Sequence, residues 1–115
     1  MIALVLSLLA LTAQAAPKPP VIAPEDAAHH LGKHVIVRGT VAQIVVTRNL
    51  TTHINFGGDY PNQVFSAAFF KAKRAEFPGV RDYQGKVVEV EGVVHLSRKK
   101  PEIVMIDRKQ IRLAP

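Results

Sequence analysis

The segment GKHVIVRGTV at residues 32–41 is repeated as GKVVEVEGVV at residues 85–94. Both copies read G-K-x-V-x-V-x-G-x-V, and valines at alternating positions are typical of a β-strand that buries one face. A glycine inside such a strand lowers stability unless the strand bends or bulges there, so each copy predicts a long, bent strand. Two copies are too few for a solenoid, which needs roughly three or more stacked repeats. The repeat therefore predicts two matched strands in one small, curled barrel.

The sequence around the two copies alternates between strand patterns and turn residues. The inward set of the first strand shifts from odd to even positions between Val41 and Ile44, which predicts a β-bulge at 39–42. In the third strand, the parity that places Phe65 and Phe69 inside gives the better core face, and Phe56 is expected inside the second strand. The patterns predict a helix at 24–31, strands at 33–47, 52–58, 64–70, 86–96 and 102–106, a helical insert within 71–84, and a final extended piece at 110–113.

This order of elements is that of the oligonucleotide/oligosaccharide-binding (OB) fold. The OB fold is a five-stranded Greek-key barrel that closes by pairing its long first and fourth strands, which here are the two copies of the repeat. A small barrel of the SH3 type is the alternative, but it leaves the helical insert unexplained. We therefore expect a mainly β protein with a five-stranded OB barrel, a short N-terminal helix, and a helical insert between strands three and four.

The first fifteen residues, MIALVLSLLALTAQA, form an apolar run that ends in the small-x-small pattern Ala13-Gln14-Ala15. This outline predicts a secretory signal peptide at 1–15, with Ala16 as the first mature residue; an uncleaved anchor is the alternative. Residues 16–23 follow as a proline-rich leader, and residues 24–115 are expected to form the OB-fold domain, since about 100 residues support one core. The expected location is the periplasm or the medium, with no transmembrane segment in the mature chain. The chain has no cysteine, which excludes a lipid anchor, disulfides and thiol chemistry.

The charge of the chain favours acidic partners. Its 15 Lys and Arg exceed its 9 Asp and Glu, for a net charge of +6, and all of these residues follow position 15. Such a surplus on a small domain favours polyanions, namely nucleic acids, acidic glycans or phospholipid head groups. A purely solubilising role of the same charge is the simpler interpretation.

Residues 53–65, HINFGGDYPNQVF, resemble a segment of small exported bacterial OB-fold domains of the nucleic-acid-binding type. Relatives of this kind carry the pattern N-[FL]-G-x-x-Y-P-x-Q-x-F, sometimes beside secreted thermonuclease-like nucleases. The repeated G-K-x-V-x-V-x-G phrase and the segment RKKPEI at 98–103 agree with the resemblance. It implies an OB fold and nucleic-acid binding, whereas the catalytic arginine and carboxylates of thermonuclease-like enzymes have no counterpart in this chain.

An OB barrel binds its ligand across the second and third strands, between the loops that follow the first and fourth strands. We expect cations in and beside these loops to contact phosphates, and rings and polar groups on the strand face to contact bases. The predicted ligand-binding residues are Arg48, His53, Asn55, Tyr60, Ser66, Phe70, Lys71, Arg98, Lys99 and Lys100. Each also has a simpler interpretation, as a solvated hairpin tip or a side chain packed under a loop.

Catalysis and metal binding find little support in the residues. After position 15 the serines are Ser66 and Ser97, and no G-x-S-x-G elbow is present. Glu89 and Glu91 alternate on one strand face, where we expect them to pair with Arg38 across the ladder. The histidines lack a carboxylate or cysteine at a recognisable metal-ligand spacing. We therefore predict no enzymatic activity, no metal and no cofactor.

The sequence thus favours a secreted or periplasmic OB-fold protein that binds single-stranded nucleic acid, DNA or RNA, or another polyanion through backbone electrostatics. The alternative is a periplasmic OB-fold module that binds a protein, a glycan or a small molecule. A third hypothesis is an accessory domain that works beside a separate nuclease or another envelope protein.

Overall fold

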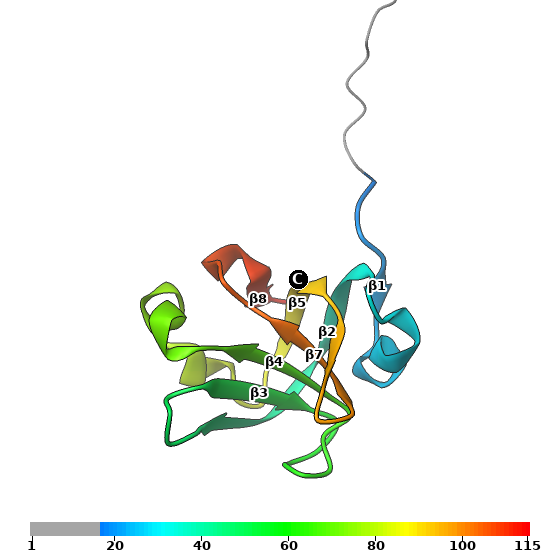
Figure 1. The fold of residues 1–115 in the computed structure, drawn as a ribbon. Helices are drawn as coiled ribbons and strands as arrows, with labels where there is room; N and C mark the ends of the chain where they lie inside the picture. Colours follow the sequence, from blue (N-terminus) through cyan, green and yellow to red (C-terminus); the bar gives the residue numbers. More distant parts are fainter. Residues whose placement is uncertain (1–16) are drawn as a thin grey trace, which may run out of the picture.

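The computed structural model describes residues 17–115, which form one strongly curved sheet with short 3-10 helices around it (Figure 1). The predicted signal peptide and the predicted first mature residue, Ala16, lie outside the described residues. Within residues 17–115, no helix is long and apolar enough to span a bilayer. The elements are β1 (Val21–Ile22), η1 (Pro24–His30), β2 (His34–Val46), β3 (Thr52–Phe56), β4 (Phe65–Phe69), η2 (Lys71–Glu76), η3 (Val80–Tyr83), β5 (Val87–Val93), β6 (His95–Ser97), β7 (Lys100–Val104), η4 (Arg108–Gln110) and β8 (Ile111–Leu113).

The main strands follow the path of an OB barrel. The long strand β2 pairs antiparallel with β5 through residues 34–40 and with β3 through residues 41–46, so it belongs to both halves of the barrel. Strand β4 pairs antiparallel with β3, and β7 adds to β4 in parallel. Strands β2, β3, β4, β5 and β7 therefore form a partly open Greek-key barrel. The prediction of a mainly β, OB-like architecture is confirmed.

The predicted number of strands and the helix type need correction. Residues 17–115 contain eight strands, because the short strands β1, β6 and β8 extend the five of the barrel. Strand β1 lies in the predicted leader, where two residues are too few to show a period-2 pattern. Strand β6 separates from β5 at Val94, which forms a bridge to Leu31 instead. The predicted helical regions are 3-10 helices. The proline, acidic and glycine residues that predicted them mark where a helix begins and ends, and they do not distinguish a 3-10 helix from an α-helix.

The two glycines of the repeat lie where another element comes close to the strand. The bulge predicted at 39–42 is present, because the register of β2 with β3 shifts across residues 41–43. Strand β5, in contrast, runs through Gly92 in continuous register with β2, so a bulge does not explain the second glycine. A Cβ atom on Gly92 would lie 2.5 Å from Ile103 Cγ2, and one on Gly39 would lie 2.5 Å from Pro24 Cγ. Close approach therefore accounts for both glycines.

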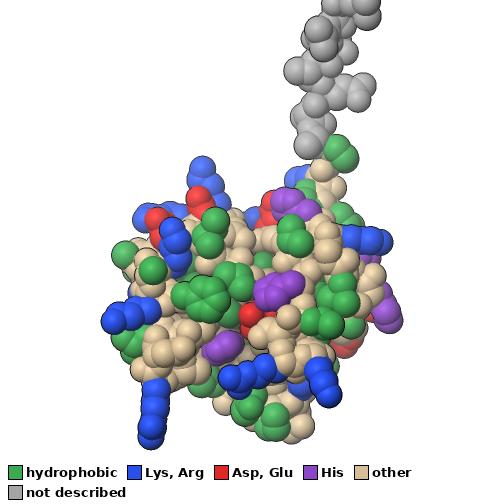
Figure 2. All heavy atoms as spheres, in the orientation of Figure 1, with side chains coloured by type: hydrophobic (Ala, Val, Ile, Leu, Met, Phe, Trp, Pro, Cys, Tyr) green, Lys and Arg blue, Asp and Glu red, His purple; other side chains and the backbone are tan. Residues whose placement is uncertain are grey.

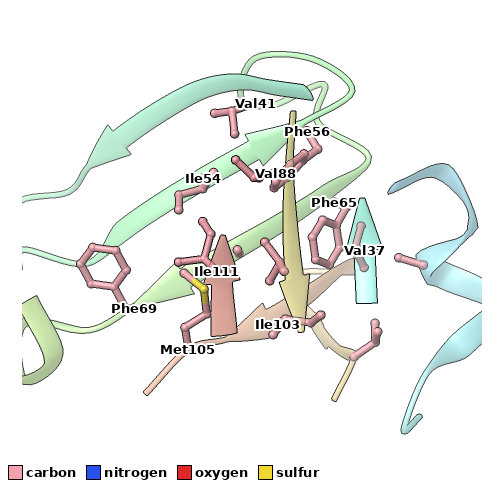
Figure 3. Close-up of a cluster of buried hydrophobic side chains, with 14 of the residues drawn as sticks. Val37, Val41, Ile54, Phe56, Phe65, Phe69, Val88, Ile103, Met105 and Ile111 are labelled. Atoms are coloured by element: carbon pink, nitrogen blue, oxygen red, sulfur yellow. The ribbon is translucent and has the colours of Figure 1, made fainter. Parts of the chain in front are cut away.

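Aliphatic and aromatic side chains fill the barrel (Figure 3). Phe56, Phe65 and Phe69 are at most 2% exposed, which confirms their predicted inward orientation. The ring of Phe77, which follows η2, stacks on Phe69 with ring centroids 4.4 Å apart, so the helical insert contributes to the core. Burial of each ring stabilises the fold by about 1.5–3 kcal/mol.

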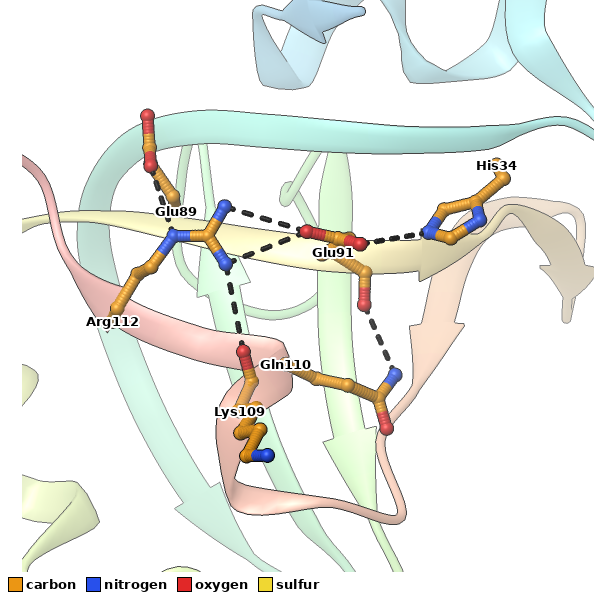
Figure 4. Close-up of polar contacts among 6 residues, drawn as sticks. All are labelled: His34, Glu89, Glu91, Lys109, Gln110 and Arg112. Carbon is orange, nitrogen blue, oxygen red and sulfur yellow. Dashed lines mark hydrogen bonds and ion pairs between the residues drawn. The ribbon is translucent and has the colours of Figure 1, made fainter. Parts of the chain in front are cut away.

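The acidic residues of β5 belong to a polar network whose pairing differs from the one expected from the sequence (Figure 4). Glu89 lies opposite Arg38 in the ladder, but its carboxylate pairs with Arg112 of β8 at 3.1 Å. The same guanidinium lies 3.4 Å from Glu91, which also pairs with His34 at 3.0 Å. Arg112 takes the place expected for Arg38 because β8 lies along the other edge of β5 and brings Arg112 opposite Glu89.

Candidate ligand-binding groove

A groove of about 770 Å³ crosses the outer face of β3, β4 and β7, bounded by the loops at 47–51 and 57–64 and by the β6–β7 hairpin. Figure 2 shows histidine and acidic side chains together near the centre of this face, with Lys and Arg side chains around them. Seven predicted ligand-binding residues line the groove, namely His53, Asn55, Tyr60, Ser66, Phe70, Arg98 and Lys100. The other three, Arg48, Lys71 and Lys99, do not line it, although each is the chain neighbour of a lining residue.

A row of polar side chains crosses the floor of the groove and continues onto β2. The ladder places its five members opposite one another in strand order, namely Gln43, Asn55, Ser66, Glu102 and His95. Residues directly opposite each other in a sheet point to the same face, so β2, β3, β4, β7 and β6 contribute one polar stripe.

The centre of this row is a satisfied hydrogen-bond network. Asn55 is 2% and Ser66 5% exposed, and the Ser66 hydroxyl donates to Asn55 Oδ1 at 2.7 Å. The Asn55 amide donates to Gln43 Oε1 at 3.0 Å, and that oxygen also accepts from the backbone N–H of Tyr60 at 2.9 Å. Asn55 and Ser66, expected as direct ligand contacts, therefore bind each other, hold the floor and anchor the loop that carries Tyr60.

The carboxylate of Glu102 lies in the same floor and lacks such partners. Glu102 is 8% exposed, and within residues 17–115 no group donates a hydrogen bond to its carboxylate. Ring nitrogens of His53 and His95 lie 3.7 and 3.5 Å from its two oxygens, beyond the usual N–H···O range of about 2.7–3.2 Å. Across the described chain, no group of three or more His, Asp or Glu is arranged to hold a metal ion. Glu102 is therefore a largely buried carboxylate that meets the groove with two histidines beside it and no Lys or Arg paired to it.

Two large rings lie at the edge of the groove. Tyr60, in the loop at 57–64, is 63% exposed, and Phe70, directly after β4, is 54% exposed. Neither ring is packed under a loop, which was the simpler interpretation of both residues. Exposed rings beside a groove offer flat apolar surfaces on which a planar ligand group can stack.

The β6–β7 hairpin turns tightly through two cations, where the sequence suggested a longer basic loop. Ser97 pairs with Lys100, which leaves Arg98 and Lys99 as the central residues, with φ of +50° and +68°. Two left-handed central residues are the pattern of a type I′ turn, for which Asn-Gly is strongly preferred. Other side chains held in this conformation cost about 1–3 kcal/mol each, and such strain clusters at functional sites. This turn thus presents two cations at the expense of stability.

Lys100 has a structural role in the groove. Its Nζ donates to the carbonyl oxygens of Pro61 and Gln63, the latter at 2.8 Å. The ammonium group therefore joins the β6–β7 hairpin to the loop at 57–64, and the phosphate contact expected of Lys100 from the sequence stays a prediction.

Replacing Lys100 by methionine should lower the free energy of unfolding by about 1–2 kcal/mol, because two carbonyl oxygens lose a charged donor. Methionine keeps the apolar stem of lysine. Lys99→Met is the matched control, since Lys99 is exposed and its side chain donates no hydrogen bond within residues 17–115. Urea unfolding followed by circular dichroism measures both changes, and equal stability of the two variants would show that Lys100 does not hold the walls together.

Sequence reasoning missed three members of the polar row, namely Gln43, His95 and Glu102. The change of parity after the bulge was a signal for Gln43, because it turns odd positions outward. A single charge in an apolar strand, within the segment RKKPEI, was a signal for Glu102. His95 had no comparable signal, because the break between β5 and β6 decides on which face of the sheet its side chain lies.

No protein-family model and no curated protein matches this chain significantly, whereas solved structures do. The fold is similar to OBody AM1L10 bound to hen egg-white lysozyme, with a TM-score of 0.60 and 18% identity over 88% of this chain and 98% of that chain. For OBody AM2EP06, also bound to hen egg-white lysozyme, the TM-score is 0.56, with 16% identity over 87% of this chain and 96% of that chain. The hypothetical protein YgiW of E. coli aligns with 20% identity over 88% of this chain and all of that chain, with a TM-score of 0.47. The likeness to the two OBodies is one of fold, and it supports the OB-like barrel described above.

Proposed function

We propose that this protein is an exported OB-fold module that binds single-stranded nucleic acid in the groove over β3, β4 and β7. One observation carries the proposal: two exposed rings line the same groove as Arg98, which lies with Lys99 in a strained turn at the groove edge. The export in this proposal rests on the signal-peptide pattern in the sequence of residues 1–15. No chemical step is part of the proposal.

The cations at the groove edge contact the phosphate backbone of the ligand, and the rings contact its bases. Arg98 lines the groove, and Arg48, Lys71 and Lys99 lie beside lining residues, so cations flank the path of a phosphate backbone. Single-strand binding proteins combine such a path with aromatic side chains on which successive bases stack. Because every base has a π face, stacking on Tyr60 and Phe70 suits a ligand of varied sequence.

Changing Arg98 to asparagine together with Lys99 to glycine should raise stability and weaken binding. Asn-Gly is the preferred type I′ pair, so relief of two left-handed side chains should add about 1–2 kcal/mol to the free energy of unfolding. Loss of two phosphate contacts should reduce the steepness of the log–log salt dependence by about 1.4, from roughly 0.7 per contact. Thermal unfolding, and anisotropy of a labelled oligothymidylate over a salt series, measure the two effects.

The matched control is the double variant Lys33→Gln, Lys86→Gln, which removes the same net charge from exposed residues that do not line the groove. It should leave the affinity and its salt dependence nearly unchanged. Equal weakening by both double variants would mean that binding follows net charge alone. Absence of binding at low salt would favour a protein, glycan or small-molecule ligand instead; OBody AM1L10, bound to lysozyme, is an OB-type fold with a protein partner.

A further inference from the structure

We infer that the floor of the groove selects guanine, with the Glu102 carboxylate accepting the two adjacent N–H donors of one base. The inference rests on the proposed function, because it names the base that the same groove prefers. It follows from a difference between the two parts of the groove: the floor presents hydrogen-bond acceptors, whereas the rim presents cations.

The floor has acceptors that lack donors. The Glu102 carboxylate, in a residue 8% exposed, accepts no hydrogen bond within residues 17–115. Gln63 lines the same groove, and its Oε1 atom is buried without a hydrogen-bond partner in that part of the chain. The Gln63 oxygen is itself out of a ligand's reach, whereas the Glu102 carboxylate lines the groove, and a largely desolvated carboxylate favours a ligand that brings N–H groups.

The charges around Glu102 separate the place of a base from the place of a phosphate. Its charged or titratable neighbours in the described chain are His53 and His95, and no Lys or Arg pairs with it. Lys100, the lysine that lines the groove, is bound to the carbonyl oxygens of the loop at 57–64. A phosphate at the floor would meet the Glu102 carboxylate with no Lys or Arg paired to it, so the backbone belongs at the cationic rim and a base belongs at the floor.

Among the nucleic-acid bases, guanine fits a carboxylate best. Its Watson–Crick edge carries two neighbouring donors, N1–H and the 2-amino group, which match the two oxygens of one carboxylate in a bidentate pair. Adenine and cytosine place a single amino group beside an acceptor, and thymine and uracil place one N–H between two carbonyl oxygens, which a carboxylate repels. Unpaired bases in single strands expose this edge to protein side chains.

The test compares oligothymidylates of about eight nucleotides, within the span of one OB fold, that carry thymine, guanine or inosine at one central position. Inosine keeps N1–H and lacks the 2-amino group. The natural protein should bind the guanine probe about tenfold more tightly than the thymine probe, as expected for one bidentate contact. The inosine probe should fall between them. In Glu102→Gln the three probes should bind alike, with affinity for the thymine probe kept or slightly raised.

Glu25→Gln is the matched control, because Glu25 is exposed in η1 and does not line the groove. It should keep the full preference for guanine. If the thymine probe binds but guanine gives no advantage, or if the advantage survives in Glu102→Gln, the inference is wrong and the proposed function stands. If no probe binds, both are wrong. The guanine–inosine comparison on the natural protein needs no variant, so a folding defect of Glu102→Gln cannot rescue the inference.

Discussion

Replacing Gly92 by valine should lower the free energy of unfolding by about 2–3 kcal/mol and the melting temperature by about 10–20 °C. The new Cβ would lie 2.5 Å from Ile103 Cγ2 and 3.2 Å from Gln110 Nε2. Ile103 is fully buried in the barrel, and the Gln110 side chain forms the capping box of η4. Neither can move without loss of packing or hydrogen bonds, so β5 and β7 must separate.

Gly39→Val should destabilise the protein in a similar way, because its Cβ would lie 2.5 Å from Cγ of the rigid Pro24 ring. Thr40→Val is the matched control, since Thr40 is an exposed neighbour in the same strand. Strand propensity alone favours valine by up to about 1 kcal/mol. A loss at positions 39 and 92 with none at position 40 therefore isolates the close approach. Unchanged melting temperatures at both glycines would contradict the packing of η1 on β2 and of β7 on β5.

Loss of both exposed rings should abolish most of the binding affinity. The double variant Tyr60→Ala, Phe70→Ala is expected to weaken binding of an oligothymidylate by about 2–4 kcal/mol, since each base stack contributes roughly 1–3 kcal/mol. Thermal stability should change little, because the rings are 63% and 54% exposed. The salt dependence should also persist, because no cation is removed. Fluorescence anisotropy over a salt series measures affinity and salt dependence together.

The control exchanges the two rings, with Tyr60→Phe and Phe70→Tyr in one protein. It keeps both π faces and should bind like the natural protein. If the alanine variant binds as tightly as this control, the rings do not stack on bases. The cations and the floor of the groove would then be the remaining contacts for a single strand.

Much of the barrel is readable from local patterns. Alternating valines mark the buried face of β2 and β5, and the change of parity after Val41 marks the bulge, because the side-chain period of a strand is a property of consecutive residues. The same parity places Phe65 and Phe69 inside. The exposure of Tyr60 and Phe70, in contrast, is a finding of the structure.

The groove floor, in contrast, exists only through the register between strands far apart in the chain. Asn55, Ser66 and Glu102 come from three strands, and no local pattern states that they face one another. Packing of β7 against β5 likewise decides why position 92 is glycine, since the crowding atom belongs to Ile103 of β7. Lys99 and Lys100 are chemically identical neighbours, yet one lies in a left-handed turn and the other binds two carbonyl oxygens. Local sequence sets which face of a strand is buried, whereas contacts between strands far apart in the chain set what each outward side chain meets.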